Sequence, residues 1–330
     1  MKRIAVLTSG GDAPGMNAAI RSVVRTALHH GLSVFGVSRG YLGLMNGEIQ
    51  EMDTRSVGDI VQRAGTILRS ARSERFKTEE GQREALFQLE KFGIEGLVVI
   101  GGDGSFRGAK CLSDLGVPTI GIPASIDNDV ACTDLAIGFD TATNTAVDAI
   151  TKIRDTASSH GRVNVIEVMG RTTGFLALAA GLAGGAEHIL IPEVEFDLDD
   201  ICDKILSGYR RGKTHNIIVV AEGVGGYRDP GQGFGHSAGF EVGRTLQEKT
   251  GLETRVTVLG YIQRGGTPTA QDRILASRFG LRAVELLMAG RAARVVGITR
   301  GEIMDYDISY AVSQKKTINL DDYRLSEMLT

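Results

Sequence analysis

Residues 97–115 read LVVIGGDGSFRGAKCLSDL, and this stretch decides the fold class. The apolar run Leu97–Ile100 is short and continuous, which is typical of a strand buried on both faces of a sheet. Three glycines and an aspartate follow the run, and Ser105–Leu115 then shows a helical pattern. A buried strand that leads through a glycine-rich turn into a helix is the repeating unit of a parallel α/β sheet.

The same order of strand, turn and helix recurs along the chain, which predicts a mostly parallel, doubly wound α/β fold. The expected strands are Ile4–Leu7, Val34–Val37, Leu97–Ile100, Thr119–Ile122, Val163–Val168, Ile217–Ala221, Val256–Leu259 and Val295–Ile298. The expected helices are Met16–His30, Ser105–Leu115, Thr141–Ser158, Thr172–Ala183, Leu198–Arg211, Phe240–Thr250 and Asp272–Ala289.

The composition excludes several classes of protein and suggests two domains for 330 residues. Glycine is frequent (44 residues) and proline scarce (6), but 42% of residues are apolar and the net charge is −3, which excludes collagen and disordered linkers. The balance of 37 basic and 40 acidic residues argues against binding to nucleic acid or a membrane surface. Three cysteines without metal-ligand spacing argue against structural zinc and a disulfide framework, and we expect a cytoplasmic protein.

Glycine clusters follow two of the expected strands. Gly10 and Gly11 come after Ile4–Leu7, and the run from 101 to 105, GGDGS, comes after Leu97–Ile100. Ligands of open parallel sheets bind at the carboxyl ends of the strands, where backbone N–H groups of such turns can approach a phosphate. A single loop of this kind is also compatible with a tight turn alone. Two loops on one sheet favour nucleotide binding, although neither matches the P-loop or the Rossmann pattern.

Three aspartates near these strand ends indicate the chemistry. Asp103 would repel a phosphate unless a cation lay between them, and Mg²⁺ is the natural cation. Asp127 and Asp129 follow the next strand, and two neighbouring carboxylates suggest a general base and a metal-linked partner. The alternative for these aspartates is an ordinary polar turn. Five arginines near strand ends or in glycine-rich segments could supply the positive charge of phosphoryl transfer: Arg72, Arg162, Arg171, Arg255 and Arg264.

Five long motifs connect the sequence with a known family. They are LTSGGDAPGMNAAIR at 7–21, VVIGGDGS at 98–105, IDND at 126–129, VMGR at 168–171 and VLGYIQRGGTP at 258–268. With these motifs the chain resembles bacterial ATP-dependent 6-phosphofructokinases from the first strand to about residue 313. The resemblance implies two doubly wound, mostly parallel sheets with the active site in the cleft between two domains. It also implies a nucleotide-binding domain of residues 1–138 plus about 263–313, and a sugar-phosphate-binding domain of residues 139–262 plus about 314–330.

The resemblance further implies that the chain transfers a phosphoryl group from Mg-ATP to the 1-hydroxyl of fructose 6-phosphate. Asp127 would take the hydroxyl proton, Asp103 would hold Mg²⁺ and Asp129 would lie near the metal. Arg72 and Arg171 would stabilise the transferring group, with Ser125 also among the catalytic residues, where it retains the hydroxyl of the family's usual threonine. The implied ATP site comprises Gly11, Tyr41, Arg72, Gly102, Asp103, Gly104, Ser105 and Gly108. The implied sugar-phosphate site comprises Ser125, Asp127, Arg162, Met169, Gly170, Arg171, Glu222, Arg255, Tyr261 and Arg264.

The family also implies partners. The equivalents of Arg162 and Arg255 come from a neighbouring subunit in that family, so the resemblance implies a homotetramer. It implies in addition an effector site between subunits for ADP or phosphoenolpyruvate, comprising Arg21, Arg25, Arg55, Arg154, Glu187, Arg211, Lys213 and His215.

Some residues depart from the family's pattern, and they leave alternatives open. Tyr261 stands where the family usually has a histidine beside the sugar phosphate. The segment Gly223–Gly239 contains seven glycines and is interpreted as a surface insertion, the alternative being a cover over the sugar pocket. A pyrophosphate-dependent relative would tend to carry aspartate at Gly104 and lysine at Ala124, so the small residues present favour ATP. A catalytically silent sensor is disfavoured because all three aspartates are present.

Overall fold

The computed structural model of the chain describes residues 1–226 and 237–329. Contacts between residues divide it into two compact units. Unit 1 comprises Met1–Thr141 and Arg264–Lys316, and unit 2 comprises Ala142–Gln263 and Thr317–Thr330. These units are defined by contacts alone, and the functional domains expected above stay a prediction.

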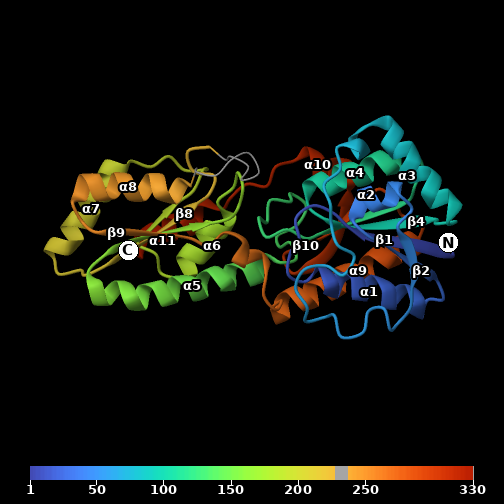
Figure 1. The fold of residues 1–330 in the computed structure, drawn as a ribbon, viewed down its shortest axis with the longest axis horizontal. Coiled ribbons are helices and arrows are strands. Elements are labelled where there is room, and N and C mark those ends of the chain that lie inside the picture. The colour runs from blue at the N-terminus through green and yellow to red at the C-terminus, as the bar shows by residue number, and fades with distance from the viewer. Residues whose placement is uncertain (227–236, 330) are drawn as a thin grey trace. The chain divides into compact units, whose positions relative to one another are not determined.

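Unit 1 is built on a sheet with the strand order β11-β10-β5-β4-β1-β2-β3 (Figure 1). Its inner neighbours are parallel, whereas β3 and β11 at the two edges run antiparallel to their partners. The strands are β1 (Arg3–Thr8), β2 (Ser33–Val37), β3 (Ile49–Met52), β4 (Gly96–Gly101), β5 (Thr119–Pro123), β10 (Arg294–Thr299) and β11 (Glu302–Asp307).

Helices cover both faces of this sheet. Helices α1 and α9 pack against each other on one face, and α2, α3, α4 and α10 share a hydrophobic core on the other (Figure 1). In that core Leu7 and Val99 of the inner strands pack with Phe106 of α4, all fully buried. The helices are α1 (Met16–His29), α2 (Gly40–Met45), α3 (Glu79–Lys91), α4 (Asp103–Asp114), α9 (Ala270–Met288) and α10 (Ile308–Ser313), with a 3-10 turn η1 (Arg75–Lys77).

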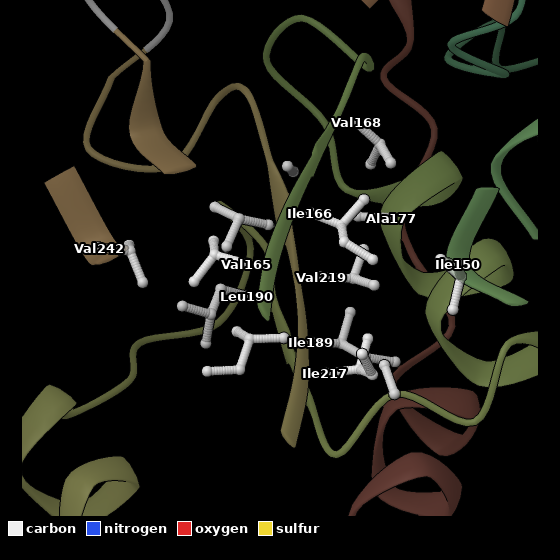
Figure 2. Packing of buried hydrophobic residues seen from close by; sticks show 14 of the residues in the cluster. Ile150, Val165, Ile166, Val168, Ala177, Ile189, Leu190, Ile217, Val219 and Val242 are labelled. Carbon is white, nitrogen blue, oxygen red and sulfur yellow. The ribbon is translucent and has the colours of Figure 1, made fainter. Parts of the chain in front are cut away.

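Unit 2 has a parallel sheet in the order β7 (His188–Leu190), β8 (Asn216–Ala221), β6 (Val163–Val168) and β9 (Thr254–Val258). Successive residues of β6 point to opposite faces, so that Val165 faces Val242 and Ile166 faces Ala177 (Figure 2). Burial on both faces explains why β8 is apolar after Asn216 and why β6 is mostly valine and isoleucine, with Asn164 and Glu167 as its two polar residues. The other elements are α5 (Phe139–His160), α6 (Phe175–Ala183), α7 (Leu198–Arg210), α8 (Ala238–Thr250), the 3-10 turn η3 (Gly260–Arg264) and α11 (Leu320–Met328). The first three residues of α5 and the last residue of η3 belong to unit 1.

The predicted α/β fold with two mostly parallel sheets is confirmed. The edge strands β3, β7 and β11 were not predicted: β3 and β7 have only four and three residues, and three of the six residues of β11 are exposed. Among the described residues, none of the helices combines the length and apolar character that a bilayer crossing requires.

The three cysteines are free, and burial raises the pKa of the Cys132 thiol to about 12, which makes it unreactive.

The predicted loop Gly223–Gly239 is wrong at its carboxyl end, because Gly239 lies in α8. The Gly239 N–H donates to Glu167 Oε2 at 2.7 Å, and a Cβ on this glycine would lie 3.1 Å from Glu167 Cβ. The glycine therefore allows α8 to approach β6 closely. Residues 227–236 lie outside the described residues, and the predicted surface insertion stays a prediction.

Candidate active site

The carboxyl ends of three adjacent parallel strands meet at one edge of the unit 1 sheet. In the register of β1, β4 and β5, Thr8 pairs with Ile100 and Gly101 pairs with Pro123. The pairing continues past the strands, since Ala124 N donates to the Gly101 carbonyl at 2.9 Å. The structure thus brings together three loops that the sequence marked as candidates: 9–11, 102–105 and 124–129.

Glycine is required at the turn into α4 by close packing. A Cβ on Gly101 would overlap both Ser105 Oγ and the Ser9 carbonyl oxygen. Gly104 is different, because nothing lies within 4 Å of the position that its Cβ would take. Gly102 caps α4 without a side chain, so the first N–H groups of the helix have no side-chain cap. A helix N-terminus of this kind, with free space above it, can accept a phosphate.

Asp103 is the first residue of α4, and its side chain is 39% exposed. Its Oδ2 lies 3.0 Å from Arg107 Nε. Among residues 1–226 and 237–329 no cluster of three or more His, Cys, Asp or Glu side chains could bind a metal alone. Mg²⁺ commonly uses one or two carboxylates and completes its shell with water and substrate phosphates. A single accessible carboxylate beside this open glycine-rich loop therefore fits Mg²⁺ that arrives with a nucleotide.

Asp127 is buried, with 5% of its surface exposed, and its N–H donates to Ser125 Oγ at 3.2 Å. The next residue, Asn128, has a φ of +52°, a left-handed conformation that asparagine tolerates. Its Nδ2 donates to the Asp134 carbonyl at 3.1 Å and its Oδ1 accepts from Ala136 N at 2.9 Å. These two bonds hold the loop that carries Asp127 and its neighbours, a role for Asn128 that the sequence did not reveal.

Lys316 also stabilises the loop that carries Asp127, a role that the sequence did not predict. Its Nζ donates to the Asp134 carbonyl at 2.8 Å, the oxygen that also accepts from Asn128. Burial lowers the pKa of Lys316 to about 8, although attraction to Asp134 and Asp129 opposes the shift. The contact joins residues 182 positions apart in the chain, so no local pattern could have indicated it.

Tyr41 supports α4 from within unit 1. Its hydroxyl donates to the Ser105 carbonyl at 2.6 Å, and its ring stacks on Phe76 at a centroid distance of 4.1 Å. A Cβ on Gly108 would lie only 2.7 Å from that ring. Burial raises the pKa of Tyr41 well above its usual range. The structure therefore gives Tyr41 and Gly108 a packing role, and their expected contact with ATP stays a prediction.

Two arginine-bearing segments lie against the first glycine loop. The Arg264 guanidinium fills the space beside Gly11, where a Cβ would lie 2.8 Å from Nη1. Ser70 Oγ donates to the Gly10 carbonyl at 2.6 Å, which fixes the segment just before Arg72 at the same loop. Arg72 itself is exposed.

In unit 2, Glu222 links the carboxyl ends of two adjacent parallel strands, β8 and β6, by hydrogen bonds. Its Oε1 accepts from Gly170 N at 3.1 Å and from Arg171 N at 2.7 Å. Gly170 and Arg171 have φ values of +147° and +54°, so the carboxylate stabilises an otherwise costly turn. The structure thus brings Glu222 to the segment Met169–Arg171, as expected for one part of the sugar-phosphate site.

Arg162 and Arg255 lie at the other end of the same sheet. Arg162 directly precedes β6, and Arg255 in β9 pairs with Asn164. Met169 follows the carboxyl end of β6, and six residues of strand span about 20 Å. Tyr261, 74% exposed, follows β9 in η3 at the carboxyl side of that strand. Within unit 2 the structure therefore separates the two arginines from the other expected sugar-phosphate residues.

Three of the expected effector residues form one cluster in unit 2. Glu187 Oε1 lies 3.5 Å from Arg154 Nη1 and 3.3 Å from Lys213 Nζ, and the glutamate side chain is 10% exposed. Its Oε2 accepts from Ile217 N at 2.6 Å. Arg211 is exposed directly after α7. His215 is half-buried in the same unit, and Arg21, Arg25 and Arg55 belong to unit 1.

Comparison with known proteins gives consistent matches over the whole chain. A sequence model of the family described as "Phosphofructokinase" matches residues 3–287. The curated ATP-dependent 6-phosphofructokinase of Halothermothrix orenii is 61% identical over 331 residues, covering 100% of both chains. The protein of the same name from Clostridium tetani is 60% identical over 330 residues, again covering 100% of both.

Solved structures agree with these sequence matches. Phosphofructokinase from Saccharomyces cerevisiae aligns with a TM-score of 0.84 and 37% identity, covering 94% of this chain and 45% of the yeast chain. This chain therefore spans less than half of the yeast chain. Pyrophosphate-dependent phosphofructokinase from Nitrosospira multiformis aligns with a TM-score of 0.86 over 96% of this chain and 86% of its own, at 21% identity. A likeness at that identity shows the shared fold alone.

Proposed function

The chain belongs to the phosphofructokinase family, and we propose that it transfers the γ-phosphoryl group of ATP to the 1-hydroxyl of fructose 6-phosphate. The products are fructose 1,6-bisphosphate and ADP, and the reaction is the committed step of glycolysis. The observation that carries the proposal is the full-length identity of 61% and 60% to two enzymes named ATP-dependent 6-phosphofructokinase. The glycine loops and aspartates at one sheet edge supply the chemistry that this activity needs.

The proposed reaction step uses residues of the unit 1 edge together with Arg171 of unit 2. The carboxylate of Asp127 accepts the proton of the 1-hydroxyl, whose oxygen then bonds to the γ-phosphorus while the bond to the β,γ-bridging oxygen breaks. Ser125 and Asp129 flank this base in the same loop. The N–H groups of loop 102–105 hold the phosphates, and Arg72 and Arg171 offset the negative charge of the transferring group. Mg²⁺, held by Asp103 and phosphate oxygens, would neutralise part of that charge.

The sugar phosphate would be bound by residues from two copies of the chain. Met169–Arg171 and Glu222 offer one set of groups, and Arg264 belongs to the same proposed site. Arg162 and Arg255 would come from a neighbouring copy, which agrees with their position at the opposite end of the unit 2 sheet. The proposed active form is a homotetramer, with residues 1–138 plus about 263–313 as the nucleotide-binding domain and the remainder binding the sugar phosphate.

The choice of ATP over pyrophosphate rests on space at the phosphate loop. Nothing lies within 4 Å of the position that a Cβ on Gly104 would take, which supports room for an α-phosphate, and the small Ala124 stands where a pyrophosphate enzyme would tend to carry lysine. A coupled assay that offers ATP or pyrophosphate against several sugar phosphates tests this proposal. Fastest turnover with ATP and fructose 6-phosphate is expected, and faster turnover with pyrophosphate would reject the assignment of the donor.

The proposed effector site predicts a regulatory phenotype for Arg211. Its exposed guanidinium would bind a phosphate of ADP or phosphoenolpyruvate, so Arg211→Ala should abolish the response of the rate to both effectors. Rates at subsaturating fructose 6-phosphate, measured with and without each effector, provide the readout. Arg210→Ala, an exposed neighbour in the last turn of α7, is the matched control and should keep the response. Equal regulation in both variants would refute the assignment.

Tyr261 predicts a weakened sugar-phosphate site. Tyrosine can donate a hydrogen bond but carries no positive charge, so Tyr261→His should lower the half-saturating fructose 6-phosphate concentration by about 2- to 10-fold below pH 7, where histidine is charged. Initial rates at fixed ATP measure the change. Tyr310→His, at a tyrosine on α10 that is 48% exposed, is the control. An unchanged half-saturating fructose 6-phosphate concentration in Tyr261→His would show that residue 261 does not contribute to sugar-phosphate binding.

A further inference from the structure

We propose that Glu253 is a built-in counter-anion for the Arg162–Arg255 pair and sets how strongly that pair binds the phosphate of the sugar. The carboxylate forms ion pairs with both guanidinium groups in the ligand-free chain, so an incoming phosphate must displace it. This inference rests on the proposed function, and it adds a specificity-determining residue that the sequence did not mark.

The contacts of Glu253 carry the inference. Its Oε2 lies 2.9 Å from Arg162 Nε, and its Oε1 forms an ion pair with Arg255 Nη2. One carboxylate therefore divides its two oxygens between two arginines. The backbone fixes this arrangement, because Val163 N donates to the Glu253 carbonyl at 3.1 Å where β9 joins β6.

The exposure of the three side chains makes the carboxylate displaceable. Arg255 is 61% exposed, Glu253 45% and Arg162 29%, so solvent and ligands can reach the pair. Ion pairs as exposed as these are individually weak. The hydrogen bond from Arg162, with further attraction to both arginines, lowers the pKa of Glu253, although partial burial opposes the shift. The lowered pKa favours the anionic form of the carboxylate, which is the form that competes with a phosphate.

Competition with a carboxylate also selects among ligands. A phosphate monoester carries a charge of about −1.5 to −2 at pH 7 and three acceptor oxygens, whereas the glutamate offers one charge and two oxygens. A phosphate thus gains from replacing Glu253. A sugar acid with a single carboxylate gains nothing by replacing Glu253 at the arginines. A neutral sugar has no charged group that could replace it. Glu253 would therefore reject ligands of lower charge at the cost of some affinity for the correct one.

Glu253→Gln tests the inference, because the amide keeps the size of the side chain and removes its charge. Two affinities are measured on the full chain: half-saturation for fructose 6-phosphate from initial rates, and binding of inorganic phosphate by calorimetry. Loss of two exposed ion pairs predicts binding about 2- to 10-fold tighter in both measurements. Glu248→Gln, at an exposed glutamate of α8, removes the same charge away from the arginines and should leave both affinities as they are.

The outcomes separate three accounts. Unchanged affinities in Glu253→Gln would overturn the inference. Weaker binding together with a lower kcat would also overturn it, because Glu253 would then hold the arginines in their binding position. If the wild-type chain does not turn over fructose 6-phosphate at all, the proposed function fails, while the calorimetric comparison of Glu253→Gln with the wild type still decides the role of Glu253. Glu253→Ala should behave like Glu253→Gln, which guards against an effect specific to glutamine.

Discussion

Replacing Asp127 with serine is expected to lower kcat by about 10²- to 10⁴-fold, the loss typical of a missing general base. Serine cannot accept the proton of the 1-hydroxyl at neutral pH, although it fits the space of the aspartate. Asp127 is buried in the loop after β5, and Asn128 and Lys316 hold this loop by hydrogen bonds to the same carbonyl. The loop should therefore keep its shape in the variant, and both substrates should still bind.

Steady-state rates measure kcat for Asp127→Ser, and calorimetry measures substrate binding. Asp114→Ser makes the same chemical change at the exposed end of α4. Within the described residues, Lys110 is the only ion-pair partner of Asp114. This control is expected to keep the wild-type kcat. Near-normal turnover in Asp127→Ser would remove Asp127 from the mechanism.

Replacing Asp272 with alanine is expected to reduce the free energy of unfolding by about 3–5 kcal/mol. Asp272 is 1% exposed and lies in the first turn of α9. Its Oδ1 accepts from Gly138 N at 2.8 Å and its Oδ2 from Thr141 N at 2.9 Å, while the Thr141 hydroxyl donates to the same Oδ2 at 2.5 Å. Alanine would leave three buried donors without their acceptor, at about 1–3 kcal/mol each.

Urea denaturation followed by circular dichroism checks the Asp272→Ala prediction through the midpoint of unfolding. Asp307→Ala is the control, because Asp307 is an exposed N-cap of α10 that accepts from Ser309 N at 2.7 Å. Loss of that cap should cost about 1 kcal/mol. If both variants unfold at the same urea concentration, the buried network does not stabilise unit 1 as argued.

The central strands could be predicted because burial on both faces leaves a simple mark in the sequence. Val163–Val168 was predicted with the bounds that β6 has, and its residues are buried throughout. Strand β11 was not predicted because three of its six residues are only half-buried and the other three are exposed, so no continuous apolar run marks it. Helix α2 escaped because six residues are too few for a helical pattern to stand out.

The candidate site could be predicted where local chemistry marks it. A glycine-rich turn after a buried strand and an aspartate inside that turn are local features, and Gly101–Asp103 shows both. The roles of Lys316 and Glu253 depend on contacts between distant segments, such as the 182 residues that separate Lys316 from Asp134. Asn128 contacts residues only six and eight positions away, but its left-handed conformation leaves no pattern in the sequence. Arg162 shows a different limit. The sequence placed it near a strand end, but only the structure shows that this is the amino end of β6.

Product analysis tests the central claim most directly. The chain is incubated with Mg²⁺, ATP and fructose 6-phosphate, and the sugar product and ADP are quantified by phosphorus NMR and chromatography. We expect one fructose 1,6-bisphosphate for each ADP, with the new phosphate on the 1-hydroxyl, and formation of this product about 10²- to 10⁴-fold more slowly by Asp127→Ser. ADP formed without the bisphosphate, or bisphosphate formed only when pyrophosphate replaces ATP, would contradict the central claim.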